Sequence, residues 1–170
     1  MGKQRWMAPE IVMGKNDPDK NSDRFSLAVV LFRLLFINHP LEGRYSTPPC
    51  MTKEAEQKYY GSAPIFVYDP STSENRPIPG TDHNLKLFWN VYPDYVKDAF
   101  IRAFSHDVMM KQKPRILEKE WMDIFIRLRT EIGRCPYCGQ ETFYTFKGSH
   151  DIPCMECGKK IPITNALQIK

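Results

Sequence analysis

The sequence has no apolar stretch long enough to cross a bilayer. Its longest apolar run, residues 25–36, is interrupted by Ser26 and Arg33, and a transmembrane helix needs about 20 residues. The first twelve residues hold no apolar segment and no small-residue cleavage site, so no secretion signal is expected. These two absences predict a protein of the reducing cytoplasm without a membrane span.

Glycine and net charge are also scarce. The 170 residues include 9 glycines, and no two of them lie two positions apart, which excludes a G-x-G phosphate-binding loop. The formal net charge of +4 argues neither for nor against a polyanionic partner. Apolar residues still make up 42% of the chain and aromatic residues 12%. That composition supports a folded core and excludes disorder.

Residues 22–37 form the clearest predicted element. Nearly every position is apolar, which is typical of a central helix with other elements packed on every side. Ser22 or Asp23 is suited to cap its start. Pro40 follows its end, where a proline prevents the helix from continuing.

The other predicted helices lie on both sides of a proline-rich stretch. Apolar spacings of three and four predict helical structure over 85–104 and 116–129. Residues 43–84 contain six prolines and are expected to be mostly loop, with a short helix at 51–60 and an extended piece at 65–68. We therefore expect a predominantly α main domain.

Four of the five cysteines lie in the last quarter of the chain, as two C-x-x-C-G sequences: Cys135, Cys138, Cys154 and Cys157. In a chain without an export signal this spacing indicates a metal site before a disulfide framework. The 15 residues between the pairs suffice for a hairpin, so this region resembles a zinc ribbon. Four thiolates close the coordination shell, which predicts a structural Zn²⁺ site without a catalytic position.

Two alternatives to zinc remain open, a rubredoxin-like iron site and a pair of disulfides. His150 is a further candidate ligand, although a surface position at the edge of the turn is favoured for it, and Cys50 is expected to be an ordinary loop thiol. Residues 131–170 carry five basic and four acidic side chains, a balance that makes nucleic-acid binding less favoured than a protein partner.

Four motifs of the first 129 residues resemble, in order, those of eukaryotic-type Ser/Thr protein kinases of bacteria. Residues 5–12 (RWMAPEIV) resemble the A-P-E segment that closes the activation loop, and residues 22–28 (SDRFSLA) the start of the family's central helix. Residues 39–43 (HPLEG) resemble its P-F-x-G turn. Residues 113–121 (KPRILEKEW) resemble its R-P-T-x-x-E-W block.

The resemblance implies a fold and a division of the chain. The fold expected is mainly α, an incomplete kinase-like helical C-terminal lobe over residues 1–129, followed by a small β zinc ribbon over residues 130–170. We expect these two units to have separate cores and to meet only at a short junction.

The resemblance also implies roles for single residues. Glu10 is expected to pair with Arg115 and so tie the end of the activation loop to the base of the lobe. Asp23 is expected to hold the backbone of the catalytic loop as well as to cap its helix. Lys3 replaces the threonine usual in Ser/Thr kinases. The substrate-side loop would include Arg5, Trp6 and Met7.

The motifs that handle phosphate are missing. The sequence has no V-A-I-K, H-R-D or D-F-G, and Ser105-His106-Asp107 lacks the lysine and asparagine that a catalytic loop requires. The chain alone is therefore predicted neither to bind ATP and Mg²⁺ nor to transfer phosphate. The leading interpretation is the C-terminal part of a kinase whose full-length parent phosphorylates protein hydroxyls. The alternative is a non-catalytic adaptor built from a remnant kinase lobe and a zinc ribbon.

Overall fold

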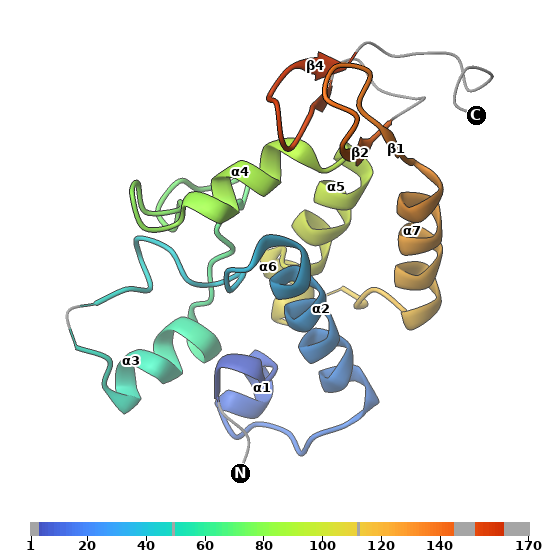
Figure 1. Ribbon diagram of the computed structural model, residues 1–170. Coiled ribbons are helices and arrows are strands. Elements are labelled where there is room, and N and C mark those ends of the chain that lie inside the picture. Colours follow the sequence, from blue (N-terminus) through green and yellow to red (C-terminus); the bar gives the residue numbers. More distant parts are fainter. Residues whose placement is uncertain (1–3, 49, 112, 145–151, 162–170) are drawn as a thin grey trace.

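The computed structural model describes residues 4–48, 50–111, 113–144 and 152–161, and Figure 1 shows a mainly helical lobe with a small β element at one end. The elements in chain order are η1 (Gln4–Trp6), α1 (Pro9–Val12), α2 (Lys20–Phe36), α3 (Lys53–Gln57), η2 (Lys58–Ser62, a π-helical turn), α4 (His83–Val91), α5 (Asp94–Ala103), α6 (His106–Met109), α7 (Glu118–Thr130), β1 (Ile132–Arg134), β2 (Glu141–Phe143), β3 (Ile152–Pro153) and β4 (Lys160–Ile161). The predicted mainly α chain with a small β element is thus confirmed. None of the described helices is long and apolar enough to cross a membrane.

The start of α2 differs from the prediction. Asp19, not Ser22 or Asp23, is the N-cap residue. Its Oδ1 accepts the Ser22 N–H at 2.6 Å, and the Ser22 Oγ accepts the Asp19 N–H at 2.8 Å. This reciprocal capping box satisfies two amides at once, so the helix begins before the position that Ser22 or Asp23 alone would set.

Helix α2 supplies the centre of the core. Phe25, Phe32 and Phe36 are buried, and the Phe32 ring makes edge contacts with Phe66 and Phe100. Such aromatic pairs stabilise a core beyond the area they bury. These contacts hold α5 and the loop that contains Phe66 against one side of α2.

The opposite side of α2 is not covered by any element of the described residues. Val30, Leu34 and Ile37 are 49%, 70% and 56% exposed. Residues three and four apart lie on one side of a helix, so these side chains form one apolar stripe. The expectation that other elements pack on every side of this helix is wrong for the described part of the chain. The helix ends where Ile37 adopts a left-handed conformation, φ 63°.

The proline-rich stretch is mostly loop, as predicted, with α3 and η2 close to the expected short helix. The expected extended piece at 65–68 forms no strand. Asn75 orders this region instead, because its Nδ2 donates to the backbone oxygens of Leu41 and Ile65 at 3.0 and 2.6 Å. Gly43 is required beside it: a Cβ there would lie 2.2 Å from the Asn75 backbone oxygen.

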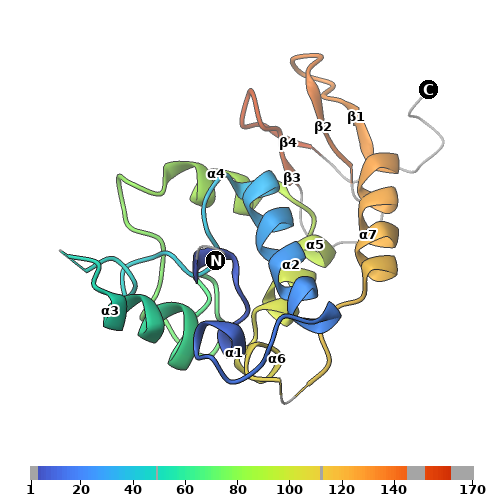
Figure 2. The same cartoon turned by 90° about the horizontal axis from the view of Figure 1, so that it is seen from below.

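The β element consists of two separate antiparallel pairs. Strand β1 pairs with β2, Ile132 opposite Phe143, and β3 pairs with β4, Ile152 opposite Ile161. We call this element, residues 132–144 and 152–161, the ribbon; Figures 1 and 2 place it at the end of the lobe formed by α4, α5 and α7.

The expected separation of the two cores is wrong. Cys135, Cys154 and Ile161 form a small cluster of their own. Phe143, however, belongs to the apolar cluster of the helical lobe, and Met155 packs against that same cluster. Both side chains come from the ribbon, so the ribbon shares part of the core of the lobe.

Candidate metal centre and substrate-side loop

The four clustered cysteines converge as their spacing predicts. Their sulfur atoms all lie within 4.8 Å of one another. The Cys135 and Cys157 sulfurs are 3.8 Å apart, and those of Cys138 and Cys154 are 3.7 Å apart. A tetrahedral zinc with bonds of about 2.3 Å separates its sulfur ligands by about 3.8 Å. These separations exceed a disulfide bond of about 2.05 Å, and all five cysteines are free. The four residues form a possible metal-binding cluster, and a single structural ion fits it.

Each C-x-x-C-G sequence makes the same tight turn. In the first turn, the Cys135 N–H donates to the backbone oxygen of Gln140 at 2.8 Å, and the Gly139 N–H donates to the backbone oxygen of Cys135 at 2.9 Å. The second turn repeats these two bonds around Cys154 at 2.9 and 3.0 Å. Gly139 and Gly158 close the turns with φ of 75° and 67°, a conformation that glycine adopts without steric cost.

The electrostatics of the cluster favour a bound cation. A backbone hydrogen bond from Cys157 lowers the pKa of the Cys154 thiol to about 7. The Gln140 backbone hydrogen bond acts the same way on Cys138, but partial desolvation and the three neighbouring cysteines together raise the pKa of that thiol to about 12. Four thiolates this close are not all ionised without a cation between them. Binding of a divalent metal to these thiols would release protons.

Glu10 and Arg115 lie together in the structure although 105 residues separate them. The guanidinium is bidentate: Nη1 donates to Oε1 at 2.9 Å and Nη2 to Oε2 at 2.8 Å. Both side chains are buried. The Lys111 Nζ lies 3.2 Å from Glu10 Oε1 and adds a second cation. Burial alone would raise the pKa of Glu10, but the hydrogen bonds and charge of Arg115, with smaller contributions from the backbone and Lys111, hold it below its usual value.

Asp23 lies exposed in the first turn of α2. Among the described residues its carboxylate has no hydrogen-bond or ion-pair partner, so its expected role at a catalytic loop has no counterpart there. Lys3 and His150 fall outside the described residues, and Cys50 is exposed and lies apart from the four clustered cysteines.

The predicted substrate-side loop is anchored through its backbone. The Ser26 hydroxyl donates to the Trp6 oxygen at 2.7 Å, and His39 Nε2 lies 2.7 Å from the Arg5 oxygen. His39 Nδ1 accepts the Leu41 N–H at 3.2 Å, which leaves the proton on Nε2, where it is donated to Arg5. The Arg5 side chain pairs with Glu42 at 2.6 Å.

Sequence reasoning did not single out Ser26 and His39 as anchors. Both nevertheless lie inside motifs that the sequence displays, at residues 22–28 and 39–43. A polar residue inside an otherwise apolar helix and a histidine before a proline were the available signals.

Acidification is expected to weaken the lobe through His39. Burial lowers the pKa of His39 to about 4, so between pH 6.5 and 4 the unfolded chain binds a proton that the folded chain excludes. The free energy of unfolding therefore decreases as the pH is lowered, by about 2 kcal/mol from pH 7 to pH 5. Urea denaturation at both pH values, on the native chain and on His39→Gln, isolates this contribution, because metal release acts equally on both chains. Equal pH dependence of the two chains would contradict the assignment.

Comparison with known proteins gives little overlap. No protein family model and no solved structure matches the chain. A stretch of 70 residues, 41% of this chain, is 29% identical to a methionine–tRNA ligase of Nanoarchaeum equitans, and it covers 8% of that ligase. The chain thus corresponds to less than a tenth of the length of this curated relative.

Proposed function

We propose that the helical lobe is the substrate-side part of a Ser/Thr protein kinase and that the ribbon is a zinc-bound structural module. The observation that carries the first half is the buried bidentate pair of Glu10 and Arg115. It joins the two residues that the kinase resemblance pairs, and chance seldom leaves two charges buried together. In the complete enzyme, the lobe would position a protein hydroxyl for phosphoryl transfer from ATP with Mg²⁺.

The anchored loop supports the same proposal. Ser26 and His39 hold the backbone oxygens of Trp6 and Arg5, and Glu42 pairs with the Arg5 side chain, so the lobe fixes the position of the loop. A loop fixed in this manner presents Arg5, Trp6 and Met7 in a constant arrangement to a substrate peptide. Preorganisation of this kind reduces the entropic cost of binding.

The metal proposed for the ribbon is zinc. Four sulfur ligands with tetrahedral spacing suit Zn²⁺ or iron, and the closed shell leaves no position for catalysis. A ribbon with strands of two and three residues has too little core to fold alone. Zinc would therefore act as a structural ion.

A non-catalytic adaptor is the second candidate. The uncovered stripe of Val30, Leu34 and Ile37 favours a lobe that another polypeptide covers, and an adaptor would use it for docking. The ligase match, over 8% of that protein, carries no argument for tRNA aminoacylation by this chain.

The genomic reading frame ahead of Met1 distinguishes the two candidates. In-frame codons for H-R-D and D-F-G, and phosphorylation of a protein substrate by the product of the whole frame, support the kinase. A stop codon followed by a ribosome-binding site directly ahead of Met1 supports the adaptor and overturns the kinase proposal.

The isolated chain is expected not to bind ATP, because the residues that hold phosphate and Mg²⁺ are missing from its sequence. Isothermal titration calorimetry with ATP, with and without Mg²⁺, measures this directly. Saturable, Mg²⁺-dependent binding at micromolar ATP would contradict the assignment of phosphate handling to other parts of the enzyme.

A further inference from the structure

Two apolar side chains of the ribbon insert into the lobe, and they come from different halves of it. Phe143 ends β2 and its ring centroid lies 5.1 Å from that of Tyr92, directly after α4. Met155 lies between the two cysteines of the second turn and packs against the same apolar cluster. Strand β3 also lies against α4. The ribbon therefore contacts α4 through β3 and contacts Tyr92, the residue after α4, through Phe143.

Glu131, the residue after α7, joins α5 and α7 to the ribbon. Its carboxylate is buried and accepts the Tyr95 hydroxyl at 2.8 Å and the Arg127 Nε at 2.9 Å. Its backbone oxygen accepts the Tyr144 N–H of the ribbon at 2.7 Å. Tyr95 lies on α5 and Arg127 on α7, so one residue links α5, α7 and the ribbon.

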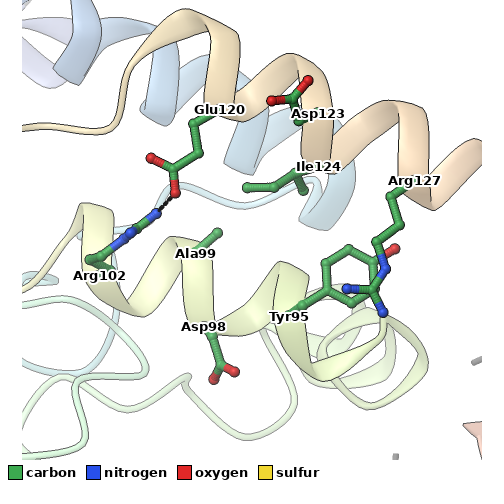
Figure 3. A pocket seen from close by; sticks show the side chains of 8 residues that line it. All are labelled: Tyr95, Asp98, Ala99, Arg102, Glu120, Asp123, Ile124 and Arg127. Atoms are coloured by element: carbon green, nitrogen blue, oxygen red, sulfur yellow. Dashed lines mark hydrogen bonds and ion pairs between the residues drawn. The ribbon is translucent and has the colours of Figure 1, made fainter. Parts of the chain in front are cut away.

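A groove separates the outer faces of α5 and α7. It has a volume of about 490 Å³, and Figure 3 shows Arg127 stacked on the Tyr95 ring across one end of it, with the guanidinium carbon 3.7 Å from the ring centroid. The Arg102–Glu120 ion pair bridges the other end. Exposed ion pairs contribute little to stability. The buried Phe100 and Trp121 rings, with centroids 4.9 Å apart, join α5 to α7 near the start of α7, and the contacts of Glu131 and Arg127 join them at the ribbon end.

We propose that the metal ion acts as a clamp on the lobe: by joining the halves of the ribbon it holds Phe143 and Met155 in place and thereby fixes α4, α5 and α7. The inference rests on the proposed metal site. The described parts of the two sheets share no strand. They meet at the four sulfurs, each close contact joining one cysteine of each turn, and at the small cluster of Cys135, Cys154 and Ile161. Removal of the ion leaves the two halves joined by that small cluster, so Phe143 and Met155 are no longer held in a fixed position relative to each other.

Hydrogen exchange of the full chain, metal-loaded and after removal of the metal with a chelator under reducing conditions, tests the clamp. Exchange in α4 and α5 is expected to rise about tenfold or more on metal removal, because opening of these helices no longer has to displace the ribbon. Helix α1, at the opposite end of the lobe in Figures 1 and 2, is expected to change little and serves as the internal reference.

Two ribbon variants separate the clamp from a general effect. Phe143→Ala is expected to raise exchange in α4 and α5 even with one metal ion bound, while Phe143→Leu raises it less. Tyr137→Ala removes an aromatic side chain of the ribbon that is 51% exposed and is expected to change nothing. If Phe143→Ala does not fold, the Phe143→Leu chain carries the comparison.

Failure of the clamp differs from failure of the metal site. A chain that binds no metal overturns the proposed site. A chain that binds one ion, yet whose α4 and α5 stay protected after its removal or lose protection equally with α1, overturns the clamp alone.

Discussion

Exchange of Cys138 for serine is expected to abolish metal binding and to unfold the ribbon. A structural zinc supplies apparent folding free energy on the order of 10 kcal/mol, far more than strands of two and three residues provide. Cys138 is exposed, so the substitution removes a ligand without opening a cavity in the core. Metal analysis is expected to give one zinc per native chain and none per Cys138→Ser chain, and chemical-shift dispersion of residues 132–161 is expected to collapse.

Cys50→Ser is the matched control, since Cys50 is exposed and free and lies outside the cluster. It is expected to retain one zinc and an unchanged ribbon. Iron in place of zinc would correct the identity of the ion. A native chain without any metal, with its cysteines joined as disulfides, would refute the site and the reducing compartment predicted from it.

Replacement of Glu10 by glutamine is expected to destabilise the lobe by about 3–5 kcal/mol, because the buried Arg115 guanidinium keeps its charge and loses its counterion. Besides Glu10, Arg115 donates to the backbone oxygens of Asn21 and Met109, and its guanidinium carbon lies 5.4 Å from the centroid of the Phe25 ring. None of these groups carries a compensating charge. Urea denaturation at pH 7 measures the loss.

Glu118→Gln provides the control, because Glu118 also pairs with an arginine, Arg24, but is half exposed. Its cost is expected to stay below about 1 kcal/mol. Similar small losses for both variants would remove the main support for the kinase assignment. Because the pKa of Glu10 is lowered in the folded chain, its contribution is present above the unfolded pKa and is lost as the pH falls through the folded pKa. The difference in the free energy of unfolding between the native and Glu10→Gln chains is therefore expected to become smaller at low pH.

The convergence of the four cysteines was predictable from sequence because the geometry of each pair is local. A C-x-x-C-G turn places its two sulfurs through a few neighbouring residues, and Gly139 and Gly158 adopt the positive φ that the turn requires. The helices were predictable for the same reason, since spacings of three and four record which side of a helix is apolar. The N-cap residue of α2 was misassigned because Asp19 and Ser22 cap each other. The consecutive residues 21–23 also all have side chains suited to an N-cap, so the sequence offers several starting points for the helix.

The contacts between distant parts of the chain carry no such local signal. The sequence around Phe143 does not indicate which core receives its side chain, and that side chain belongs to the core of the lobe. The exposure of Val30 and Leu34 could not be foreseen either, because an apolar residue records a preference for burial and not the presence of a neighbour. Glu10 and Arg115 were paired through the kinase resemblance, whereas nothing in the spacing pointed to Lys111 as a third member.

The two C-x-x-C-G turns have the same backbone hydrogen bonds, but one is exposed to solvent and the other packs against the lobe. The two turns are therefore expected to tolerate mutations differently. Pro136 and Met155 hold the same place, directly after the first cysteine of each turn, but Pro136 is exposed and Met155 packs against the lobe. A saturation library of the chain, selected for folding, should therefore accept many residues at 136 and few at 155. The frequencies of the residues accepted at these two positions would then show which of the two turns faces the lobe.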